Sequence, residues 1–314
     1  MEAATSAGAT PGVPALGVAR RRRGEQLIRA LLFLAALVSV LTTLGIVASL
    51  LFETINFLNH AGVFNFLTGT DWSPQDRSDP GYGVLPLVSG TLLITGIAIS
   101  LAIPLGLGAA IYLSEYAKPR TRRIIKPILE VLAGIPTIVF GYFALTYFTP
   151  VVLKDLIGLE VQPFNALSAG IIMAFMVLPT IASVSEDALS AVPQSLREGA
   201  YGLGASKLQV SLRVVFPAAL SGIVASMVLG ASRAIGETMI VLIAAGLVPY
   251  LGVDPTKSAE TMTTYIANTA KGDVSVGDPQ YEALFAVGTT LFVMTLLLNM
   301  IAIRFVRRYR QVYE

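Results

Sequence analysis

The chain of 314 residues contains no cysteine and a single histidine, His60. Without cysteine there can be no disulfide bond, thiolate metal site, iron–sulfur cluster or cysteine nucleophile, and one histidine cannot form a multi-histidine metal centre. Charged residues are also scarce, at 13% of the chain against about 25% in soluble proteins. So few charges cannot cover a soluble surface, which excludes a soluble enzyme, a disordered chain and a nucleic-acid-binding protein.

Hydrophobic residues make up 54% of the chain, and the mean hydropathy is +0.71. A helix needs about 20 apolar residues to cross the roughly 30 Å of membrane hydrocarbon. Six uncharged stretches meet this length, at 30–52, 86–113, 131–153, 161–185, 214–232 and 283–303. A shorter apolar run at 238–253 leaves open whether the fifth span is one long broken helix or two short ones.

The distribution of basic residues decides between six and seven spans. Of the 22 Lys and Arg residues, 17 fall in segments 20–29, 118–126, 197–213 and 304–310. Six spans place all four segments in the cytoplasm, as the positive-inside rule expects, whereas seven would put the last segment outside. We therefore predict an all-α polytopic protein with six transmembrane helices, cytoplasmic termini and a fifth span that runs on past Arg233.

This topology divides the chain into four parts. We expect a disordered cytoplasmic tail at 1–24, a first transmembrane helix with an external segment at 25–85, a transmembrane core at 86–305 and a basic tail at 306–314. The arginines at 20–23 resemble the start of a signal peptide, but the apolar run that follows is too long for one and predicts an uncleaved span. External segments should be solvated loops, with Trp72 and Tyr82 as candidate interfacial anchors.

The loop at 190–213 lies inside the transmembrane core and has a distinct pattern. Pro193 can open a helix, and the next seven residues are good helix formers. Gly202 and Gly204 then interrupt it, and a second helical pattern leads to Pro217. Such a short amphipathic helix is suited to docking on a partner protein, and an ordinary interfacial helix is the alternative.

This loop resembles that of ABC importer permeases, whose pattern is Glu-Ala-Ala, three residues, Gly, nine residues, Ile, one residue and Leu-Pro. The positions that match are Glu198, Gly199, Ala200, Gly204, Val214, Phe216 and Pro217. Three of them depart mildly from the pattern, at Gly199, Val214 and Phe216. The resemblance implies a type I ABC importer permease fold and a coupling helix that docks on an ATPase. That ATPase must be a separate subunit, because the chain has no G-x-x-x-x-G-K-[ST] loop.

A narrower resemblance covers about residues 60–305. Segments 66–74, 82–92, 132–141 and 233–239 are similar to the PstC-type phosphate permease family. The last two are shared with the PstA-type subunit, and the Trp-Ser-Pro sequence favours the PstC type. The resemblance implies phosphate as substrate, a PstA-like second permease, PstB-like ATPases, a PstS-like external phosphate-binding protein and a bacterial inner-membrane location among lipids, without cofactor or nucleic acid.

Arg233 and Glu237 are the only charges that we predict deep in the membrane. Ionisable side chains there are costly and normally face a cavity or a partner. Four residues apart on one helix, they can reach each other, so one interpretation is a self-neutralising structural pair. The other is a translocation path, in which the planar guanidinium holds two phosphate oxygens and Glu237 positions the arginine or competes for it. The resemblance favours the path.

Gly134, Pro136 and Thr137 complete the predicted substrate path. A proline break inside a span can expose backbone N–H groups to an anion, as the N-terminus of a helix does. Close helix packing is the alternative role for glycines in the spans.

The sequence favours a transport subunit that is not itself an enzyme. A permease for another oxyanion, sulfate or molybdate, is the first alternative, because the coupling loop does not distinguish substrates. A membrane-embedded enzyme or a sensor is the second, and the absence of an HExxH motif and of cysteine disfavours the enzyme.

Overall fold

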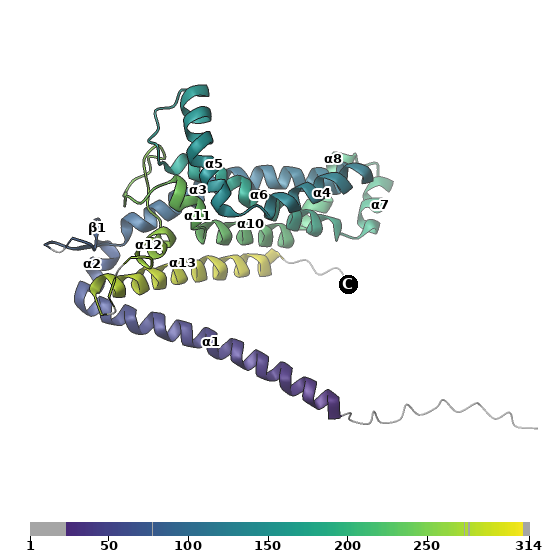
Figure 1. The fold of residues 1–314 in the computed structure, drawn as a ribbon. Helices are drawn as coiled ribbons and strands as arrows, with labels where there is room; N and C mark the ends of the chain where they lie inside the picture. The colour runs from purple at the N-terminus through teal and green to yellow at the C-terminus, as the bar shows by residue number, and fades with distance from the viewer. Residues whose placement is uncertain (1–22, 77, 273, 276, 310–314) are drawn as a thin grey trace, which may run out of the picture. The chain divides into compact units, whose positions relative to one another are not determined.

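A computed structural model of the chain describes residues 23–76, 78–272, 274–275 and 277–309. Over these residues the regular secondary structure is helical apart from one short hairpin (Figure 1). It divides between Ser49 and Leu50 into two compact units. The division falls inside α1 (Arg23–Ala61), and residues 25–49 of this helix, in the first unit, have exposed side chains almost throughout. A helix so apolar requires lipid or another protein around it.

Five helices of the described chain are long and apolar enough to cross a membrane. They are Glu25–Ala61, Leu85–Tyr116, Thr137–Leu156, Ala166–Ser190 and Pro279–Arg304. A sixth candidate is a bent pair, Lys207–Ala218 and Leu220–Ile235, with an angle of 71° between its halves. The structure thus has five candidate spans, and the predicted number of six is reached if the bent pair is one span.

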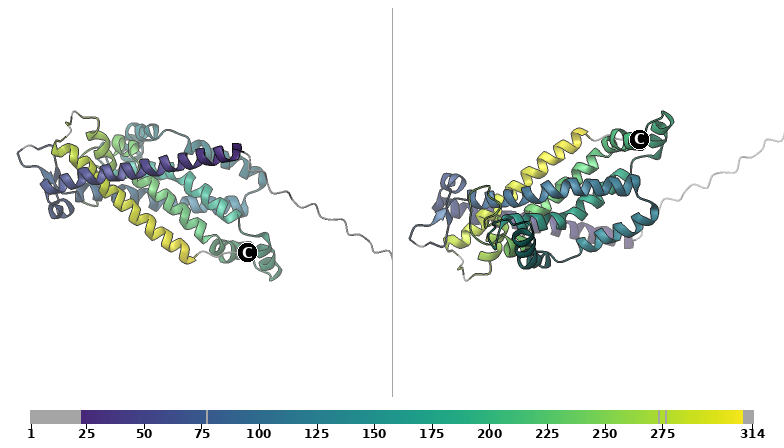
Figure 2. Two further views of the ribbon diagram at one scale, coloured as in Figure 1. Left: turned by 90° about the horizontal axis from the view of Figure 1, so that it is seen from below. Right: turned by 90° about the horizontal axis from the view of Figure 1, so that it is seen from above.

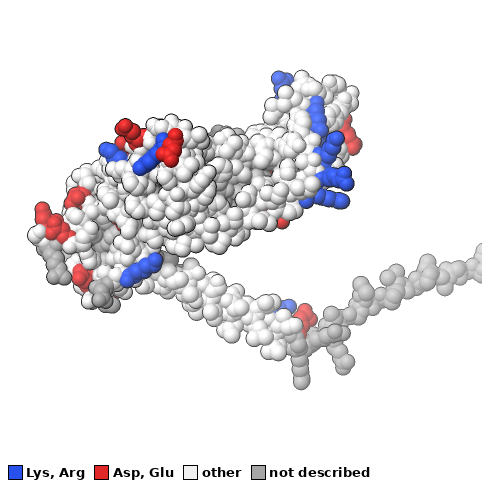
Figure 3. Space-filling view, turned by 45° about the horizontal axis from the view of Figure 1, so that its top comes forward, with Lys and Arg blue, Asp and Glu red and all other residues white. Residues whose placement is uncertain are grey.

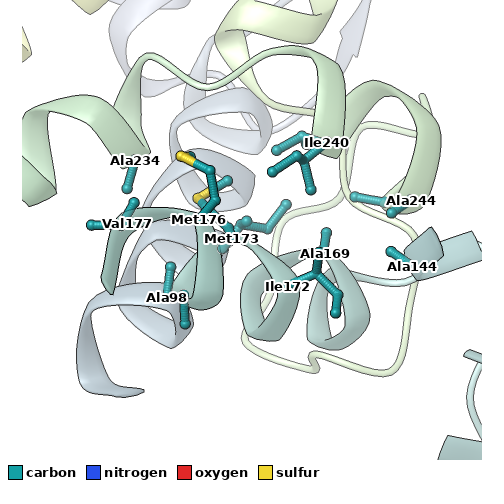
Figure 4. Packing of buried hydrophobic residues seen from close by; sticks show 14 of the residues in the cluster. Ala98, Ala144, Ala169, Ile172, Met173, Met176, Val177, Ala234, Ile240 and Ala244 are labelled. Carbon is teal, nitrogen blue, oxygen red and sulfur yellow. The ribbon is translucent and has the colours of Figure 1, made fainter. Parts of the chain in front are cut away.

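One of three hydrophobic clusters in the second unit lies between α3 (Leu85–Ile111), α6 (Ala166–Ser190), α10 (Leu220–Ile235) and α11 (Met239–Ala244). Figure 4 shows small and flexible side chains from these helices meeting at its centre. They include Ala98, Ala169, Met173, Met176, Val177, Ala234 and Ile240. Figure 2 shows α13 (Pro279–Tyr309) running beside α10, which it contacts along its length.

Glycine at two positions is required by close helix packing around Ile181 of α6. A Cβ atom on Gly106 of α3 would lie 2.9 Å from the Ile181 Cγ2, and one on Gly230 of α10 would lie 2.8 Å from its Cγ1. Small residues let membrane helices approach in this way. Packing is therefore the role of these two glycines.

The third span differs from the continuous 131–153 helix of the prediction. α4 (Pro119–Ala133) ends at Gly134, and a second rod follows, made of α5 (Thr137–Phe143) and the π-helix Ala144–Leu156. Figure 1 shows this rod turning away from α4 and standing across the bundle. Proline cannot donate the hydrogen bond that would continue the helix through position 136, so the span breaks there.

The first of the segments predicted as external is packed rather than solvated. It contains α2 (Val63–Thr68) and an antiparallel hairpin in which Trp72 pairs with Tyr82. Trp72 is 3% exposed, and its ring meets that of Tyr265 edge-on, with centroids 4.9 Å apart. Tyr265 belongs to α12 (Met262–Thr269). The prediction that Trp72 is an interfacial anchor is wrong, because aromatic neighbours bury it.

Candidate functional site

Arg233 lies in the last turn of α10 and is half-buried. One of its terminal nitrogens donates a hydrogen bond of 2.9 Å to the hydroxyl of Thr180 on α6. Within the described residues this is its only hydrogen-bond partner, and no carboxylate there forms an ion pair with it. A guanidinium has five N–H donors, so most of them remain available to an anion.

In the described structure the Glu237 side chain makes hydrogen bonds to the backbone of α11 (Met239–Ala244) and none to Arg233. α10 ends at Ile235, and the Glu237 Oε1 accepts hydrogen bonds from the N–H groups of Met239 (2.9 Å) and Ile240 (3.2 Å) at the start of α11. A carboxylate there satisfies two unpaired donors and complements the positive end of the helix dipole. The prediction that Arg233 and Glu237 share one helical face is therefore wrong, because the fifth span ends as a helix two residues after Arg233.

Two further elements fix the α10–α11 junction, by which we mean residues 233–240. Thr263 of α12 donates a hydrogen bond of 2.8 Å to the backbone carbonyl of Glu237. On another side, a Cβ on Gly141 of α5 would lie 3.1 Å from the Ile240 Cα and from the Met239 carbonyl oxygen. The junction thus depends on contacts from helices that are distant in sequence.

Gly134, Pro136 and Thr137 form the break between α4 and α5. Gly134 ends α4, Pro136 precedes α5 and Thr137 is its first residue. No side chain of the described chain caps this helix start. Neither Arg233 nor Glu237 bonds to these three residues in the part of the chain that the structure describes. The two predicted parts of the path are therefore not joined by a hydrogen bond within the described residues.

The loop at 190–213 has the predicted helix–turn–helix form. α7 (Gln194–Gly202) follows Pro193, and α8 (Lys207–Val210) starts with a capping box at Ser206. Gly204 lies between them with φ +82°, a conformation that side chains disfavour and glycine adopts readily. Pro217 lies in α9 (Phe216–Ala218), where the chain enters the fifth span.

The outer face of α7 is exposed. It carries Glu198, Gly199 and Tyr201, while Ala200 is half-buried, and the adjoining Leu203 is 91% exposed. An exposed acidic and apolar helix face is suited to docking on another protein. Sequence reasoning missed Tyr201 and Leu203, although their helical spacing from Glu198 was available.

The inner face of α7 is held by Arg197, which sequence reasoning also missed. Its guanidinium donates to the backbone carbonyls of Leu189 (2.8 Å) and Val192, and it pairs with Glu115 at 3.0 Å. Glu115 lies in the π-helical turn Tyr112–Tyr116 at the end of α3. No pattern in the sequence relates two residues so far apart.

A second ion cluster fastens α4 to the end of α6. Glu186 is almost fully buried and accepts hydrogen bonds from Arg122 and, at 2.9 Å, from Lys126. Lys126 also donates a hydrogen bond of 2.9 Å to Asp187, and its hydrogen bonds to the Glu186 and Asp187 carboxylates raise the pKa of Lys126. These contacts lie at the same end of the bundle as α7.

Charge is distributed unevenly over the surface. Figure 3 shows Lys and Arg gathered at one end of the molecule, while the other end carries acidic and basic residues together. The described residues contain no group of three or more His, Cys, Asp or Glu that could hold a metal ion.

Glu260 is a buried carboxyl group outside the membrane-spanning helices. It lies just before α12, is 4% exposed, and accepts no side-chain hydrogen bond within the described residues. Burial raises its pKa to about 8. Its backbone packs against Gly90 of α3, where a Cβ would lie 2.2 Å from the Glu260 carbonyl oxygen.

The sequence is similar to curated membrane transport proteins. It is 34% identical over 292 residues to the probable ABC transporter permease protein YqgH of Bacillus subtilis, covering 92% of each chain. It is 36% identical over 286 residues to the phosphate transport system permease protein PstC of Mesorhizobium japonicum, covering 85% of this chain and 86% of the relative. It is 35% identical over 278 residues to PstC 1 of Mycobacterium tuberculosis, covering 78% and 82%.

Solved structures share the fold. A bacterial alginate ABC transporter, bound to a periplasmic protein that holds alginate pentasaccharide, matches with a TM-score of 0.63 and 17% identity, covering 93% of this chain and 100% of that one. The inward-facing MetNI methionine ABC transporter matches with a TM-score of 0.55 and 17% identity, covering 73% and 95%.

The family assignment follows from the sequence match, with which the helical fold agrees. Residues 102–311 match the family described as the binding-protein-dependent transport system inner membrane component. The chain belongs to this family and is a multi-pass inner-membrane permease subunit of an ABC importer.

Proposed function

We propose that this chain is the permease subunit through which an ATP-driven importer moves inorganic phosphate across the bacterial inner membrane. Arg233 contacts phosphate during translocation, and Glu237 tunes the site indirectly by capping α11. Gly134, Pro136 and Thr137 contribute the break between α4 and α5 to the same path. ATP hydrolysis takes place on a separate subunit.

The proposal rests on the few hydrogen-bond partners of Arg233 in a half-buried position. Its guanidinium is half-buried between transmembrane helices, yet within the described residues it binds only the Thr180 hydroxyl. A desolvated anion needs charge-assisted donors to replace its lost water, and arginine can hold two phosphate oxygens at once. Buried charges are normally paired, and no carboxylate of the described residues forms an ion pair with Arg233.

Phosphate is supported over other oxyanions by the relatives. Two of the similar proteins described above are named phosphate permeases, and the segments that resemble the PstC type lie in several parts of the chain. The guanidinium alone is equally suited to sulfate or molybdate. Substrate choice is therefore the part of the proposal that a direct measurement must test.

The same proposal places the chain in a complex and in the membrane. The partners are a PstA-like second permease, PstB-like ATPases on the α7 face and a PstS-like phosphate-binding protein at the opposite end. Both termini and the coupling loop 190–213 lie in the cytoplasm. The parts of the chain are then the tail 1–24, the first helix and external segment 25–85, the transporter core 86–305 and the basic tail 306–314.

The α7 loop couples the permease to ATP hydrolysis in this proposal. Glu198, Gly199 and Ala200 lie on α7, which docks on the ATPase. Gly204 sets the turn, and Pro217 begins the fifth span. The exposure of Glu198 and the positive φ of Gly204 support these roles.

Reconstitution tests the proposed function. The chain is placed in vesicles with its ATPase, second permease and binding protein, and ATP-dependent uptake of labelled phosphate, sulfate and molybdate is measured. We expect phosphate uptake with little uptake of the other two. Sulfate or molybdate uptake at a similar rate would contradict phosphate specificity, and no uptake of any of them would contradict oxyanion transport.

A further inference from the structure

Two consecutive residues at the end of α3 contact the α7 loop on both sides of its exposed face. Glu115 pairs with Arg197 in the first half of α7, at 3.0 Å. Lys207, the first residue of α8, places its ammonium group 5.0 Å from the centre of the Tyr116 ring, a distance typical of a cation–π contact. The outer face of α7 and the glycine turn lie between Arg197 and Lys207 in the sequence. Glu115 and Tyr116, at the end of α3, therefore contact the loop before and after its exposed part.

The Arg197 contact is buried and uses the geometry of arginine. The side chains of Arg197 and Glu115 are 11% and 5% exposed. Besides Glu115, the guanidinium binds the carbonyl groups of Leu189 and Val192 at the end of α6. Its fork of donors reaches three acceptors in different directions, which a lysine ammonium on a flexible stem does not reproduce. Arg197 therefore fixes α7 to both α3 and α6.

The turn that carries Glu115 is π-helical. It spans Tyr112–Tyr116 and is closed by a hydrogen bond of 2.8 Å from the Ala117 N–H to the Tyr112 carbonyl. Single π-turns inside α-helices often mark functional positions, because the extra residue redirects the side chains. α3 and this turn form one rod, Leu85–Tyr116.

The opposite end of this rod contacts the segment before α12. Ser89 donates a hydrogen bond of 3.1 Å to the Gly252 carbonyl, and the Thr91 hydroxyl accepts one of 3.1 Å from the Met262 N–H. The next residue, Thr263, bonds to the carbonyl of Glu237. α3 therefore connects the α7 loop to the α10–α11 junction through a continuous series of contacts.

We propose that Glu115 and Tyr116 are positioning residues for coupling. By holding Arg197 and Lys207 they make α3 move with α7, so that a displacement of α7 reaches the segment that supports the α10–α11 junction. This inference rests on the proposed function, because it requires an ATPase bound to α7. A contact that only stabilises the fold would show the same geometry but would not affect coupling.

The test uses the complete reconstituted transporter with Glu115→Gln or Arg197→Lys. For each variant, ATP hydrolysis is measured with and without phosphate-loaded binding protein, alongside phosphate uptake. Allosteric coupling typically corresponds to about 5–150-fold in an equilibrium. We expect stimulated hydrolysis and uptake to fall at least about fivefold in Glu115→Gln, while basal hydrolysis and subunit co-purification are retained. The double variant should be no worse than the more damaging single one, because the two residues act as a unit.

Asp187→Asn is the matched control. It removes one carboxylate at the same end of the bundle, but Asp187 is 63% exposed and its partner Lys126 keeps Glu186. We expect the control to couple normally. A lower melting temperature with an unchanged ratio of stimulated to basal hydrolysis in Glu115→Gln would overturn the inference.

Lys207→Gln decides the matter if Glu115→Gln fails to assemble. Lys207 is exposed, so its loss should not prevent folding. Loss of a cation–π contact predicts a fall in the coupling ratio of about twofold, and an unchanged ratio would also overturn the inference. If the parental transporter shows no stimulation, the proposed function itself fails, and the inference fails with it.

Discussion

The α7 loop and the α10–α11 junction each contain one arginine partly buried among helices, and the two are bound very differently. Arg197 in the α7 loop binds one carboxylate and two backbone carbonyls. Arg233 at the junction binds one hydroxyl within the described residues. An arginine whose donors are all bound by its own chain has none left for a ligand, whereas an arginine with unused donors can bind one. The comparison separates a structural arginine from a candidate substrate-binding one without reference to any relative.

The first test asks on which side of the membrane the α7 loop lies, and each labelled position should give an all-or-none result. Single cysteines at Ser206, Ser78 and Val253 in this cysteine-free chain report which side each exposed position faces. We expect an impermeant thiol reagent outside the cell to label positions 78 and 253 and to spare 206. Labelling of 206 with protection of the other two would reverse the proposed orientation.

Substitution of Arg233 should have the largest effect on transport. Arg233→Gln removes the charge that holds the anion, and we expect phosphate uptake to fall by about 100-fold or more, since a desolvated charge pair is worth several kcal/mol. Arg233→Lys keeps the charge but loses the bidentate fork, so about tenfold is expected. Assembly should be normal, because Glu237 does not depend on Arg233 for a partner.

Arg123→Gln provides the control for that experiment. Arg123 is an exposed arginine on α4, outside the coupling loop, so the variant makes the same chemical change at an exposed site. It should transport at nearly the parental rate. Parental uptake in assembled Arg233→Gln would remove Arg233 from the transport mechanism.

Replacing each arginine by methionine compares what Arg197 and Arg233 contribute to the stability of the fold. Arg197→Met leaves Glu115 buried without a partner, and breaking a buried pair costs about 3–5 kcal/mol. Arg233→Met removes one hydrogen bond to a hydroxyl, at about 1 kcal/mol. Thermal unfolding in detergent, followed by circular dichroism, should therefore show a much larger loss at 197. Equal losses would contradict the distinction between the two sites.

The buried Glu260 should make the stability of the folded chain depend on pH. Its pKa in the folded chain is about 8, well above the ordinary 4.5 of an unfolded chain. Between these values the folded state retains a proton that the unfolded state has lost. Stability should therefore fall as pH rises through this window, by up to about 1.4 kcal/mol per pH unit, and then level off above pH 8.

Glu260→Gln should remove this part of the pH dependence, whereas Glu160→Gln, at an exposed glutamate, should leave it unchanged. Melting temperatures in detergent from pH 5 to 9 provide the measurement. Identical pH profiles for parental protein and Glu260→Gln would show that Glu260 is not protonated as its burial implies.

The smallest expected change concerns the backbone of the α7 loop. Gly204→Val forces a β-branched residue to φ +82°, at a cost of about 1–2 kcal/mol. The turn should open, and stimulated ATP hydrolysis should fall severalfold. Gly202→Val is the matched control, because Gly202 has no positive φ and open space around it. If stimulated ATP hydrolysis were the same in the two variants, the positive φ of Gly204 would not be needed for coupling.

The residues of the candidate site were predictable to different degrees. The α7 helix and its turn followed from Pro193, Gly202 and Gly204, because helix starts and breaks depend on local backbone chemistry. The predicted pairing of Arg233 with Glu237 was wrong because it depended on more than local backbone chemistry. Spacing in sequence assumes a continuous helix, and Gly236 together with the capping of α11 by Glu237 ends that continuity.

The sequence by itself predicted a membrane protein of six spans, of which the described structure has five candidates and a sixth if the bent pair is one span. It also predicted that α7 forms at its position and that the chain resembles ABC importer permeases. These features depend on the length of apolar runs, the placement of charge and local motifs, all of which are written along the chain. Only the tertiary structure decided the partners of each arginine, the burial of Trp72 and Glu260, and the contact of Glu115 with Arg197. Such pairings join residues far apart in sequence, and the helix packing that brings them together leaves no periodic trace in the chain.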